Sequence, residues 1–211
     1  MRITGGSLRG RVLDCPPGII RPAMDRMRES LFSILGPLDG LTFLDLFTGS
    51  GVLALEAVSR GASSAQAVEL DRGKKEVILK NLTMANQKVQ LTIQPAERFV
   101  MTWKKSFDII FLDPPFDYPH KADLLQRVAS SRLVHPGTRI LIHYPGENTL
   151  PTELSAPRLR GRADIPDFFR TTGETEGDSE AQSPVQGWKF LVTDQRDFGR
   201  SKVRFFSATF E

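Results

Sequence analysis

The fold is decided by one stretch of the sequence, Leu44-Asp45-Leu46-Phe47-Thr48-Gly49-Ser50-Gly51. Residues 41–47 form an apolar run bounded by glycines, which is typical of a buried parallel strand. Residues 52–60 then follow a helical pattern. Glycines between a strand and a helix let the chain turn tightly and let a ligand approach the backbone. The stretch therefore predicts the first strand-to-helix turn of a doubly wound α/β fold, with a ligand at the carboxyl end of the strand.

Strand and helix patterns continue to alternate after this turn. Strands are expected at residues 65–70, 89–93, 107–112 and 139–143, and helices at residues 72–86, 96–105 and 120–130. This alternation predicts the fold class as α/β, with a Rossmann-like, doubly wound and mostly parallel sheet. Residues 188–193 and 203–210 are expected to close the sheet as an antiparallel pair.

The segment before the alternation has a different pattern. Residues 1–13 place short apolar and polar positions around glycines and are expected to form a small hairpin. A helix is expected next, because apolar residues recur at helical spacing, namely Met24, Met27, Leu31 and Leu35. We therefore expect a basic N-terminal extension of hairpin and helix at residues 1–38 and an α/β domain at residues 39–211. A polar loop insertion is expected at about residues 157–187.

Length and composition are those of a globular protein. The chain has 211 residues, of which 40% are hydrophobic and 25% are charged. No apolar run is long enough to span a bilayer, and the first residues lack the apolar region of a signal peptide. The single cysteine, Cys15, excludes an internal disulfide bond and fits a reducing compartment. We expect a cytoplasmic monomer that does not associate with membranes.

The glycine-rich turn alone leaves two cofactors open. Residues 49–54 also fit the looser dinucleotide pattern, which permits a nicotinamide-dependent oxidoreductase. Asp45 would repel a pyrophosphate but would attract the ammonium group of an amino-acid moiety. S-adenosylmethionine carries an ammonium group, a sulfonium and no phosphate, so the turn favours it. The alternative role for Asp45 is to cap the next helix or its turn.

Acidic residues also mark the end of the second expected strand. Glu69 is placed to accept hydrogen bonds from both ribose hydroxyls of the cofactor. Asp71 is the alternative, although it is also well placed as the N-cap of the following helix. We assign Glu69 to the ribose and Asp71 to the cap. The predicted cofactor-binding set is Asp45, Phe47, Thr48, Gly49, Ser50, Gly51, Glu69, Leu70 and Ala96.

A second motif, Asp113-Pro114-Pro115-Phe116, follows the strand expected at residues 107–112. Two prolines fix φ and remove two backbone donors, which leaves a stiff turn of carbonyl oxygens and one carboxylate. These acceptors suit an amino group, and the aromatic ring can stack on a base, which contributes roughly 1–3 kcal/mol per base. We predict that these four residues form the catalytic site. The alternative is a proline-rich turn that buries Phe116.

Arginines crowd the first segment of the chain, although the net charge is only +3. A basic segment ahead of a globular core suits a polyanion, and the alternative is a solvated arginine-rich face. The arginines predicted to bind RNA phosphates are Arg2, Arg9, Arg11, Arg21, Arg26 and Arg28. No metal is expected, because the three histidines form no ligand cluster in the sequence: His120, His135 and His143.

The two motifs together resemble the class I methyltransferases that modify exocyclic amines. More narrowly, the chain resembles the bacterial family that methylates the 2-amino group of a guanine in 16S ribosomal RNA. The likeness covers about residues 1–145. Three further segments carry it: Met1-Arg2-Ile3-Thr4-Gly5-Gly6 with residues 8–11, Arg21-Pro22-Ala23-Met24-Asp25-Arg26-Met27-Arg28-Glu29-Ser30-Leu31-Phe32, and Leu55-Glu56-Ala57-Val58-Ser59-Arg60-Gly61-Ala62.

The resemblance implies a cofactor, S-adenosyl-L-methionine, and a partner, 16S ribosomal RNA within a small-subunit assembly particle. Asp113 and the Pro114 carbonyl would orient the guanine amine, Phe116 would stack on the base, and Asp113 or water would take the proton. The chain differs from the family at Gln94-Pro95-Ala96-Glu97, where an acid or amide often lies near the adenine. Backbone groups near Ala96 are therefore expected to hold the adenine.

Two rival readings remain open. One is a methyltransferase acting on adenine in DNA or on a protein amide, although such enzymes more typically carry Asn where Asp113 stands. The other is a non-catalytic RNA-binding protein, and the two intact motifs argue against it.

Overall fold

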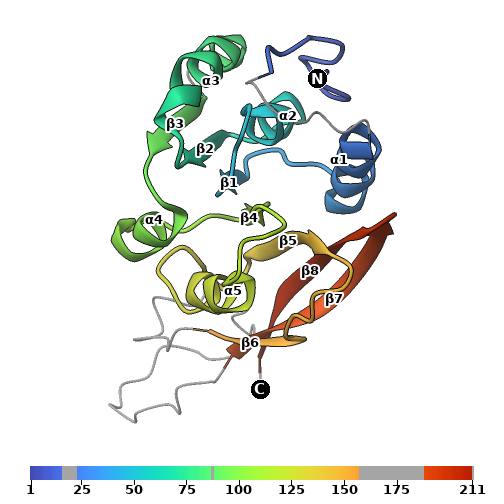
Figure 1. Cartoon of the computed structure of the whole chain (residues 1–211), viewed down its shortest axis with the longest axis vertical. Coiled ribbons are helices and arrows are strands. Elements are labelled where there is room, and N and C mark those ends of the chain that lie inside the picture. The colour runs from blue at the N-terminus through green and yellow to red at the C-terminus, as the bar shows by residue number, and fades with distance from the viewer. Residues whose placement is uncertain (16–22, 87, 157–187, 211) are drawn as a thin grey trace, which may run out of the picture.

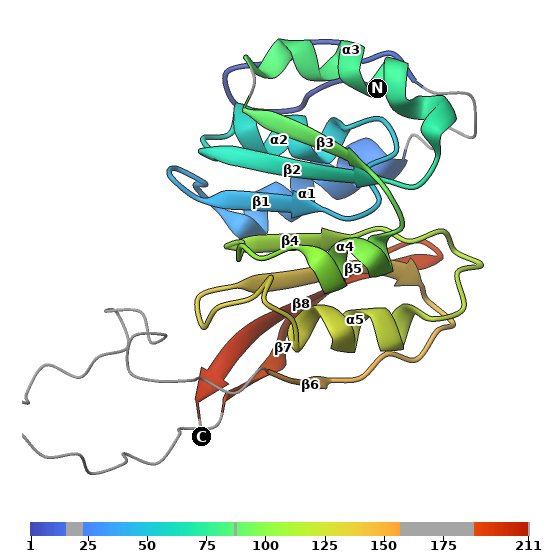
Figure 2. The same ribbon diagram turned by 90° about the vertical axis from the view of Figure 1, so that its left-hand side faces the viewer.

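The computed structural model of the protein describes residues 1–15, 23–86, 88–156 and 188–210. At its centre is an eight-stranded sheet with the strand order β3-β2-β1-β4-β5-β8-β7-β6. The first five strands in this order are parallel, and β8, β7 and β6 are each antiparallel to the preceding strand. Figure 2 shows the strands stacked in this order. The predicted doubly wound, mostly parallel sheet with a closing antiparallel pair is confirmed.

The elements follow the expected sequence closely. The strands are β1 Thr42–Asp45, β2 Ser64–Glu69, β3 Val89–Ile93, β4 Ile109–Leu112, β5 Arg139–Pro145, β6 Glu153–Ser155, β7 Trp188–Phe198 and β8 Ser201–Phe210. The α-helices are α1 Ala23–Leu35, α2 Val52–Ser59, α3 Lys75–Leu82, α4 Ala96–Thr102 and α5 Lys121–Ala129. Short 3₁₀ turns, η1 Arg72–Lys74 and η2 Thr83–Ala85, flank α3, so the helix expected at residues 72–86 is divided into three pieces. Strand β6 was not predicted.

Helices cover both faces of the sheet and create two hydrophobic cores. Figures 1 and 2 show α1, α2 and α3 on one face and α4 and α5 on the other. Alternate residues of the central strands serve the two cores: Phe43 and Ile109 join the α1–α2 side, and Leu44 and Ile110 join the α4–α5 side. Because both faces are buried, these strands are continuous apolar runs without polar alternation.

The N-terminal extension is packed against the domain that follows it. Its expected hairpin consists of one antiparallel bridge between Arg2 and Val12. Ile3 and Leu13 are buried in the same core as α1 and α2. At Gly6, with φ +76°, an added Cβ would lie 1.8 Å from the carbonyl oxygen of Ser59 on α2. The extension therefore shares a core with residues 39–211, and that close contact requires glycine.

Two sequence-based expectations lie outside the described residues, namely the insertion at residues 157–187 and the role of Arg21. Within the described ranges, no helix has both the length and the apolar character needed to cross a membrane.

Candidate active site

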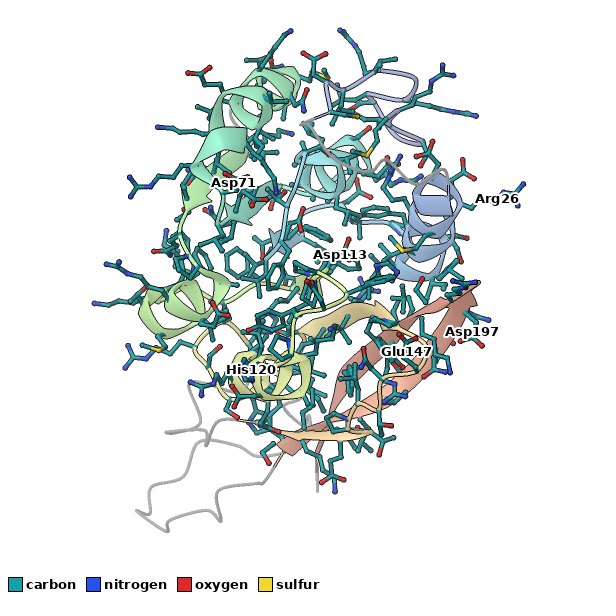
Figure 3. All side chains as sticks on the ribbon, viewed as in Figure 1. Arg26, Asp71, Asp113, His120, Glu147 and Asp197 are labelled. Atoms are coloured by element: carbon teal, nitrogen blue, oxygen red, sulfur yellow. The ribbon has the colours of Figure 1, made fainter. Side chains whose placement is uncertain are left out.

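The predicted site residues gather at the carboxyl ends of the central parallel strands. Strand β1 pairs with β2 on one side and with β4 on the other, so the strand order reverses at β1. Ligands of open α/β sheets bind at such a switch point. Asp45 ends β1, Glu69 ends β2 and Asp113 follows β4, which brings three acids from separate motifs to one edge of the sheet. Figure 3 shows Asp113 near the middle of the molecule.

The glycine turn has a geometry that other residues adopt poorly. Gly49 and Gly51 have φ of +58° and +83°, in the left-handed region. Gly51 is the N-cap of α2, and an added Cβ there would approach Leu82 Cδ2 at 3.1 Å. Thr48 N donates to Val68 O at 2.9 Å, which ties the turn to β2. The turn is thus held in place while its backbone stays close to the switch point.

Asp45 is a buried carboxylate with one unpaired oxygen. Its Oδ2 accepts a hydrogen bond from Thr48 Oγ1 at 2.7 Å, and its Oδ1 is buried without a hydrogen-bond partner in the described part of the chain. Burial raises the pKa of Asp45 to about 7, and the negative charges of Asp113 and Glu69 act in the same direction. The bond to Thr48 matches the expected alternative of a turn contact, but the N-cap of α2 is Gly51 and not Asp45. The unpaired oxygen suits a cationic ligand group.

Glu69 and Asp71 have separate roles. Asp71 is the N-cap of η1 and accepts a hydrogen bond from Gly73 N at 2.8 Å, so the predicted cap is confirmed. Glu69 Oε1 accepts from Asp71 N and Lys74 Nζ, and its Oε2 accepts from Gly49 N at 3.0 Å. A carboxylate offers about four acceptor positions, so Oε2 retains capacity for a ribose hydroxyl. The ribose role of Glu69 stays a prediction.

The remaining predicted cofactor residues surround these acids. Leu70 follows Glu69 and leaves 66% of its surface exposed, while Ala96 is buried at the first position of α4. The Phe47 ring contacts the Tyr118 ring, with centroids 5.9 Å apart. An acid with one unpaired oxygen among the described residues, a second acid with spare acceptor capacity and nearby apolar side chains fit the ammonium, ribose and adenine of S-adenosylmethionine.

Asp113 is paired with a histidine that the sequence analysis considered only as a metal ligand. Its Oδ1 lies 2.8 Å from Nδ1 of His143 on β5, while Oδ2 has no hydrogen-bond partner within the described ranges. The Phe116 ring meets the His143 ring edge-on, with centroids 5.4 Å apart, and is only half-buried. The sequence contained one signal for this role: His143 is a polar residue at the end of the apolar run at residues 139–143.

The loop after Asp113 is fixed by a buried lysine, which was also missed. Lys121 Nζ donates to the carbonyl oxygens of Phe116, at 2.7 Å, and of Tyr118. Burial lowers the pKa of Lys121. Tyr118 N donates to Pro115 O at 2.9 Å, and the Tyr118 hydroxyl donates to Glu97. The expected stiffness of the proline turn therefore has a second cause in these contacts, which hold Phe116 beside Asp113.

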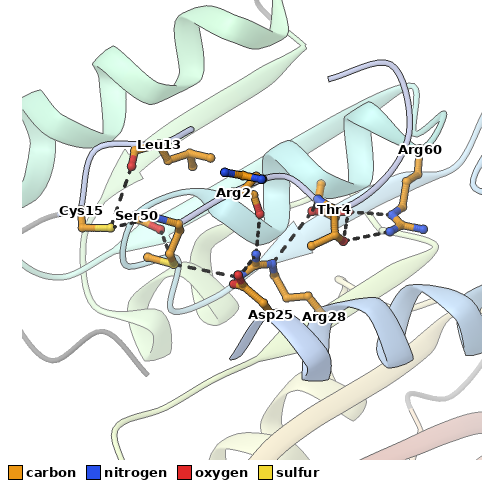
Figure 4. A network of polar contacts seen from close by, with 10 residues as sticks. Arg2, Thr4, Leu13, Cys15, Asp25, Arg28, Ser50 and Arg60 are labelled. Carbon is orange, nitrogen blue, oxygen red and sulfur yellow. Dashed lines mark hydrogen bonds and ion pairs between the residues drawn. The ribbon is translucent and has the colours of Figure 1, made fainter. Parts of the chain in front are cut away.

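The predicted RNA-binding arginines divide into two kinds. Four are exposed, namely Arg2, Arg9, Arg11 and Arg26. Arg28 is instead 1% exposed, and its Nη2 donates to Arg2 O at 2.6 Å and to Asp25 Oδ1 at 2.8 Å. Its Nε lies 3.9 Å from Oε2 of the buried Glu56. Figure 4 shows this network joining the extension to α1. The RNA-contact assignment of Arg28 is therefore corrected: the guanidinium is enclosed and holds the extension in place.

The fold and the site define the class. A doubly wound sheet closed by antiparallel strands, a glycine turn above a buried acid and an Asp-Pro-Pro-Phe loop on the adjacent strand are the features of a class I methyltransferase. Residues 1–162 match the family model described as Conserved hypothetical protein 95, and the chain belongs to this family.

Known relatives agree with this class. The chain is 33% identical over 190 residues to ribosomal RNA small subunit methyltransferase D of Escherichia coli K12, covering 86% of this chain and 94% of that protein. It is 34% identical over 158 residues to YlbH of Bacillus subtilis, named as a candidate rRNA methyltransferase, covering 72% and 86% of the two chains. The solved structure of yhhF from Escherichia coli, described as a candidate methyltransferase, matches with a TM-score of 0.72 and 27% identity over 98% of this chain and 96% of that one. The predicted resemblance is confirmed, and the protein is a methyltransferase.

Proposed function

We propose that the protein transfers a methyl group from S-adenosylmethionine to the exocyclic 2-amino group of a guanine in 16S ribosomal RNA. It does so as a cytoplasmic monomer, on RNA within a small-subunit assembly particle. One observation supports this most strongly: among the described residues, Asp113 Oδ2 has no hydrogen-bond partner, and it lies beside the switch point where the buried Asp45 has one unpaired oxygen, Oδ1. A hydrogen-bond acceptor for an amine and an acceptor for a cation therefore lie at the same edge of the sheet.

The cofactor role falls to the residues around the glycine turn. Asp45 Oδ1 pairs with the ammonium group, Glu69 accepts from the ribose, and Leu70 and Ala96 flank the adenine. When bound, S-adenosylmethionine supplies an electrophilic methyl group on a sulfonium. The backbone of Gly49 is open to a ligand, because an added Cβ at this glycine would have no heavy atom within 4 Å among the described residues.

The acceptor role falls to the Asp-Pro-Pro-Phe loop. Asp113 Oδ2 and the Pro114 carbonyl accept hydrogen bonds from the 2-amino group, which turns the nitrogen lone pair toward the methyl group. Phe116 stacks on the guanine, a contact worth roughly 1–3 kcal/mol, which offsets part of the few kcal/mol needed to extrude a base. Orientation of nucleophile and leaving group supplies much of the rate. The nitrogen then loses one proton, which Asp113 is placed to accept.

The experiment that tests this function labels the acceptor directly. The protein is incubated with radiolabelled S-adenosylmethionine and small-subunit particles from a strain that lacks the enzyme, and the labelled nucleoside is identified. We expect 2-methylguanosine, and we expect Asp113→Ala to lower the rate on the order of 100-fold or more because it removes the amine acceptor. Cofactor affinity, measured by calorimetry, should be retained in this variant. If the label appears in another nucleoside, in DNA or in protein, the methyl acceptor is not the proposed guanine.

Arg26 gives a prediction about RNA binding. Arg26→Ala is expected to weaken RNA binding and to lower the slope of log affinity against log salt by about 1, because one exposed cation no longer displaces a counterion. Binding is measured over a salt series with small-subunit RNA. Thermal stability and cofactor affinity are the controls and should not change. An unchanged salt slope would remove Arg26 from the RNA-binding set.

A further inference from the structure

The closing hairpin reaches Asp113 through a buried chain of polar groups. His143 lies on β5, and its Nδ1 faces Asp113 Oδ1 at 2.8 Å. Its Nε2 lies 2.8 Å from Oγ of Ser201, the first residue of β8. The Ser201 hydroxyl also lies 3.2 Å from the carbonyl oxygen of Phe198, at the end of β7. His143 and Ser201 are both buried, and the pairing of Pro145 with Ser201 sets their alignment.

We infer that His143 and Ser201 form a relay that positions Asp113, leaving its Oδ2 directed to the amine of the substrate. This inference rests on the proposed methyl transfer. It gives the β7–β8 hairpin, whose expected role was only to close the sheet, a part in the active site.

The proton positions of the relay follow from the hydrogen-bond inventory. An ionised Asp113 only accepts, so the short contact requires a proton on His143 Nδ1. In a neutral ring Nε2 is then an acceptor, and the Ser201 hydroxyl donates to it. If Ser201 instead donates to Phe198 O, Nε2 carries a proton and the ring is cationic. In both states Asp113 Oδ1 is occupied by the Nδ1–H donor.

This arrangement has two consequences for the reaction. First, the bond to His143 holds the carboxylate in one orientation, and of its two oxygens Oδ2 is the one without a hydrogen-bond partner among the described residues. Second, the donor at Oδ1 offsets the repulsion between the charges of Asp113 and Asp45, which the structure places close enough to interact. During transfer the N–C bond forms, the S–C bond breaks, and Oδ2 takes the proton leaving the nitrogen. His143 keeps its own proton throughout.

A second histidine–aspartate pair provides an internal control. His135 Nε2 lies 3.1 Å from Asp108 Oδ1, and Asp108 Oδ2 accepts from Thr42 N at 2.8 Å and from Thr42 Oγ1. The hydrogen bond from His135 lowers the pKa of Asp108 to about 2. This pair lies at the amino ends of β1 and β4, opposite the site. The His135–Asp108 pair therefore has the same histidine–carboxylate contact as His143–Asp113, but at the end of the sheet away from the proposed substrate.

The test compares two replacements of His143. His143→Asn places an amide N–H near the position of Nδ1, whereas His143→Gln places it near Nε2. We expect the Gln variant to lose roughly 100-fold in single-turnover methyl transfer, as a misplaced group can, and the Asn variant to retain most of the rate. Ser201→Ala should show a smaller loss. Cofactor affinity should be unchanged in all three. His135→Asn, which misplaces the donor to Asp108 Oδ1, should lower thermal stability without changing the rate.

A second readout does not depend on the substrate. Nitrogen-15 NMR should show a protonated His143 Nδ1 with a slowly exchanging proton, and Asp113→Ala should abolish this signal. Equal rates for the Asn and Gln variants, or an Nδ1 without a proton, would overturn the relay. If the wild-type protein shows the protonated Nδ1 but labels no guanine, the proposed function fails while the Asp113–His143 bond stands.

Discussion

Asp45→Asn is expected to stabilise the protein at pH 8 and to abolish cofactor binding. Burial raises the folded-state pKa of Asp45 from 3.8 to about 7, so the folded protein holds this proton more tightly than the unfolded chain. The stabilising effect of the bound proton is complete below pH 3.8 and is lost as the pH rises to about 7. The loss approaches about 4 kcal/mol above that pH. The neutral amide of Asn does not ionise, so the variant avoids this loss of stability, and the amide oxygen can still accept the hydrogen bond from Thr48 Oγ1.

The measurement is the free energy of unfolding by urea between pH 4 and pH 8, for the wild type and Asp45→Asn. The difference should grow with pH and level off above about 7. Asp71→Asn is the matched control, because Asp71 is exposed and Asn is an equally good cap. It should change stability by less than about 0.5 kcal/mol at any pH. A pH-independent difference for Asp45→Asn would show that the carboxyl is ionised at little cost.

Cofactor binding to the wild type should follow the same ionisation. The ammonium group pairs with the charged form of Asp45, so affinity should rise with pH up to about 7, and binding below that pH should release a proton. Calorimetry in two buffers of different ionisation enthalpy measures that proton. Retained affinity in Asp45→Asn would assign the ammonium group to another partner.

The sheet could be predicted because its strands are buried on both faces. Phe43 and Leu44 are adjacent yet serve opposite cores, and such pairs produce the apolar runs that the sequence displays. Strand β3 begins and ends where predicted. Strand β6 was missed because it has only three residues, and one buried residue, Leu154, between two exposed ones is too short an alternation to indicate a strand. Its place in the sheet depends on pairing with β7, a contact distant in sequence.

The site was predicted in part for a similar reason. Asp45, Glu69 and Asp113 each end or follow an apolar run, and parallel strands bring those ends to one edge. The pairing of Asp113 with His143 depends on the register of β4 against β5, where Leu112 lies opposite Ile142. Sequence periodicity gives no register between separate strands. Side-chain partners across strands therefore had to come from the structure.

Arg28 shows the same limit on the surface assignment. Its neighbour Arg26 has the same charge and lies two residues away, but a helix turns about 100° per residue, so the two side chains point in different directions. Arg26 faces solvent and Arg28 faces α2. From the sequence alone, both arginines were expected to lie on a basic surface that binds RNA. Only the packing of α1 against the extension separates the two roles.

Arg28→Met is expected to lower the free energy of unfolding by about 3 kcal/mol, the lower end of the range for breaking a buried ion pair. Methionine fills a similar volume but leaves the carbonyl oxygen of Arg2 without its donor. Glu56 keeps its hydrogen bonds from Arg60 at 2.8 Å and from Thr4, so its charge is only partly uncompensated. Arg26→Met, on the exposed face, should change stability by less than about 0.5 kcal/mol. Urea unfolding of both variants is the measurement.

The effect on RNA binding should also separate the two variants. Losing Arg28 loosens the extension that carries the exposed Arg2, Arg9 and Arg11, so RNA affinity falls through disorder of several cations. For Arg28→Met, the slope of log RNA affinity against log salt should then fall by more than the one unit expected for Arg26→Ala. Adding Glu56→Gln to Arg28→Met should recover part of the lost stability, because the uncompensated charge is removed. If Arg28→Met were as mild as Arg26→Met, the buried network would not be what holds the extension to α1 and α2.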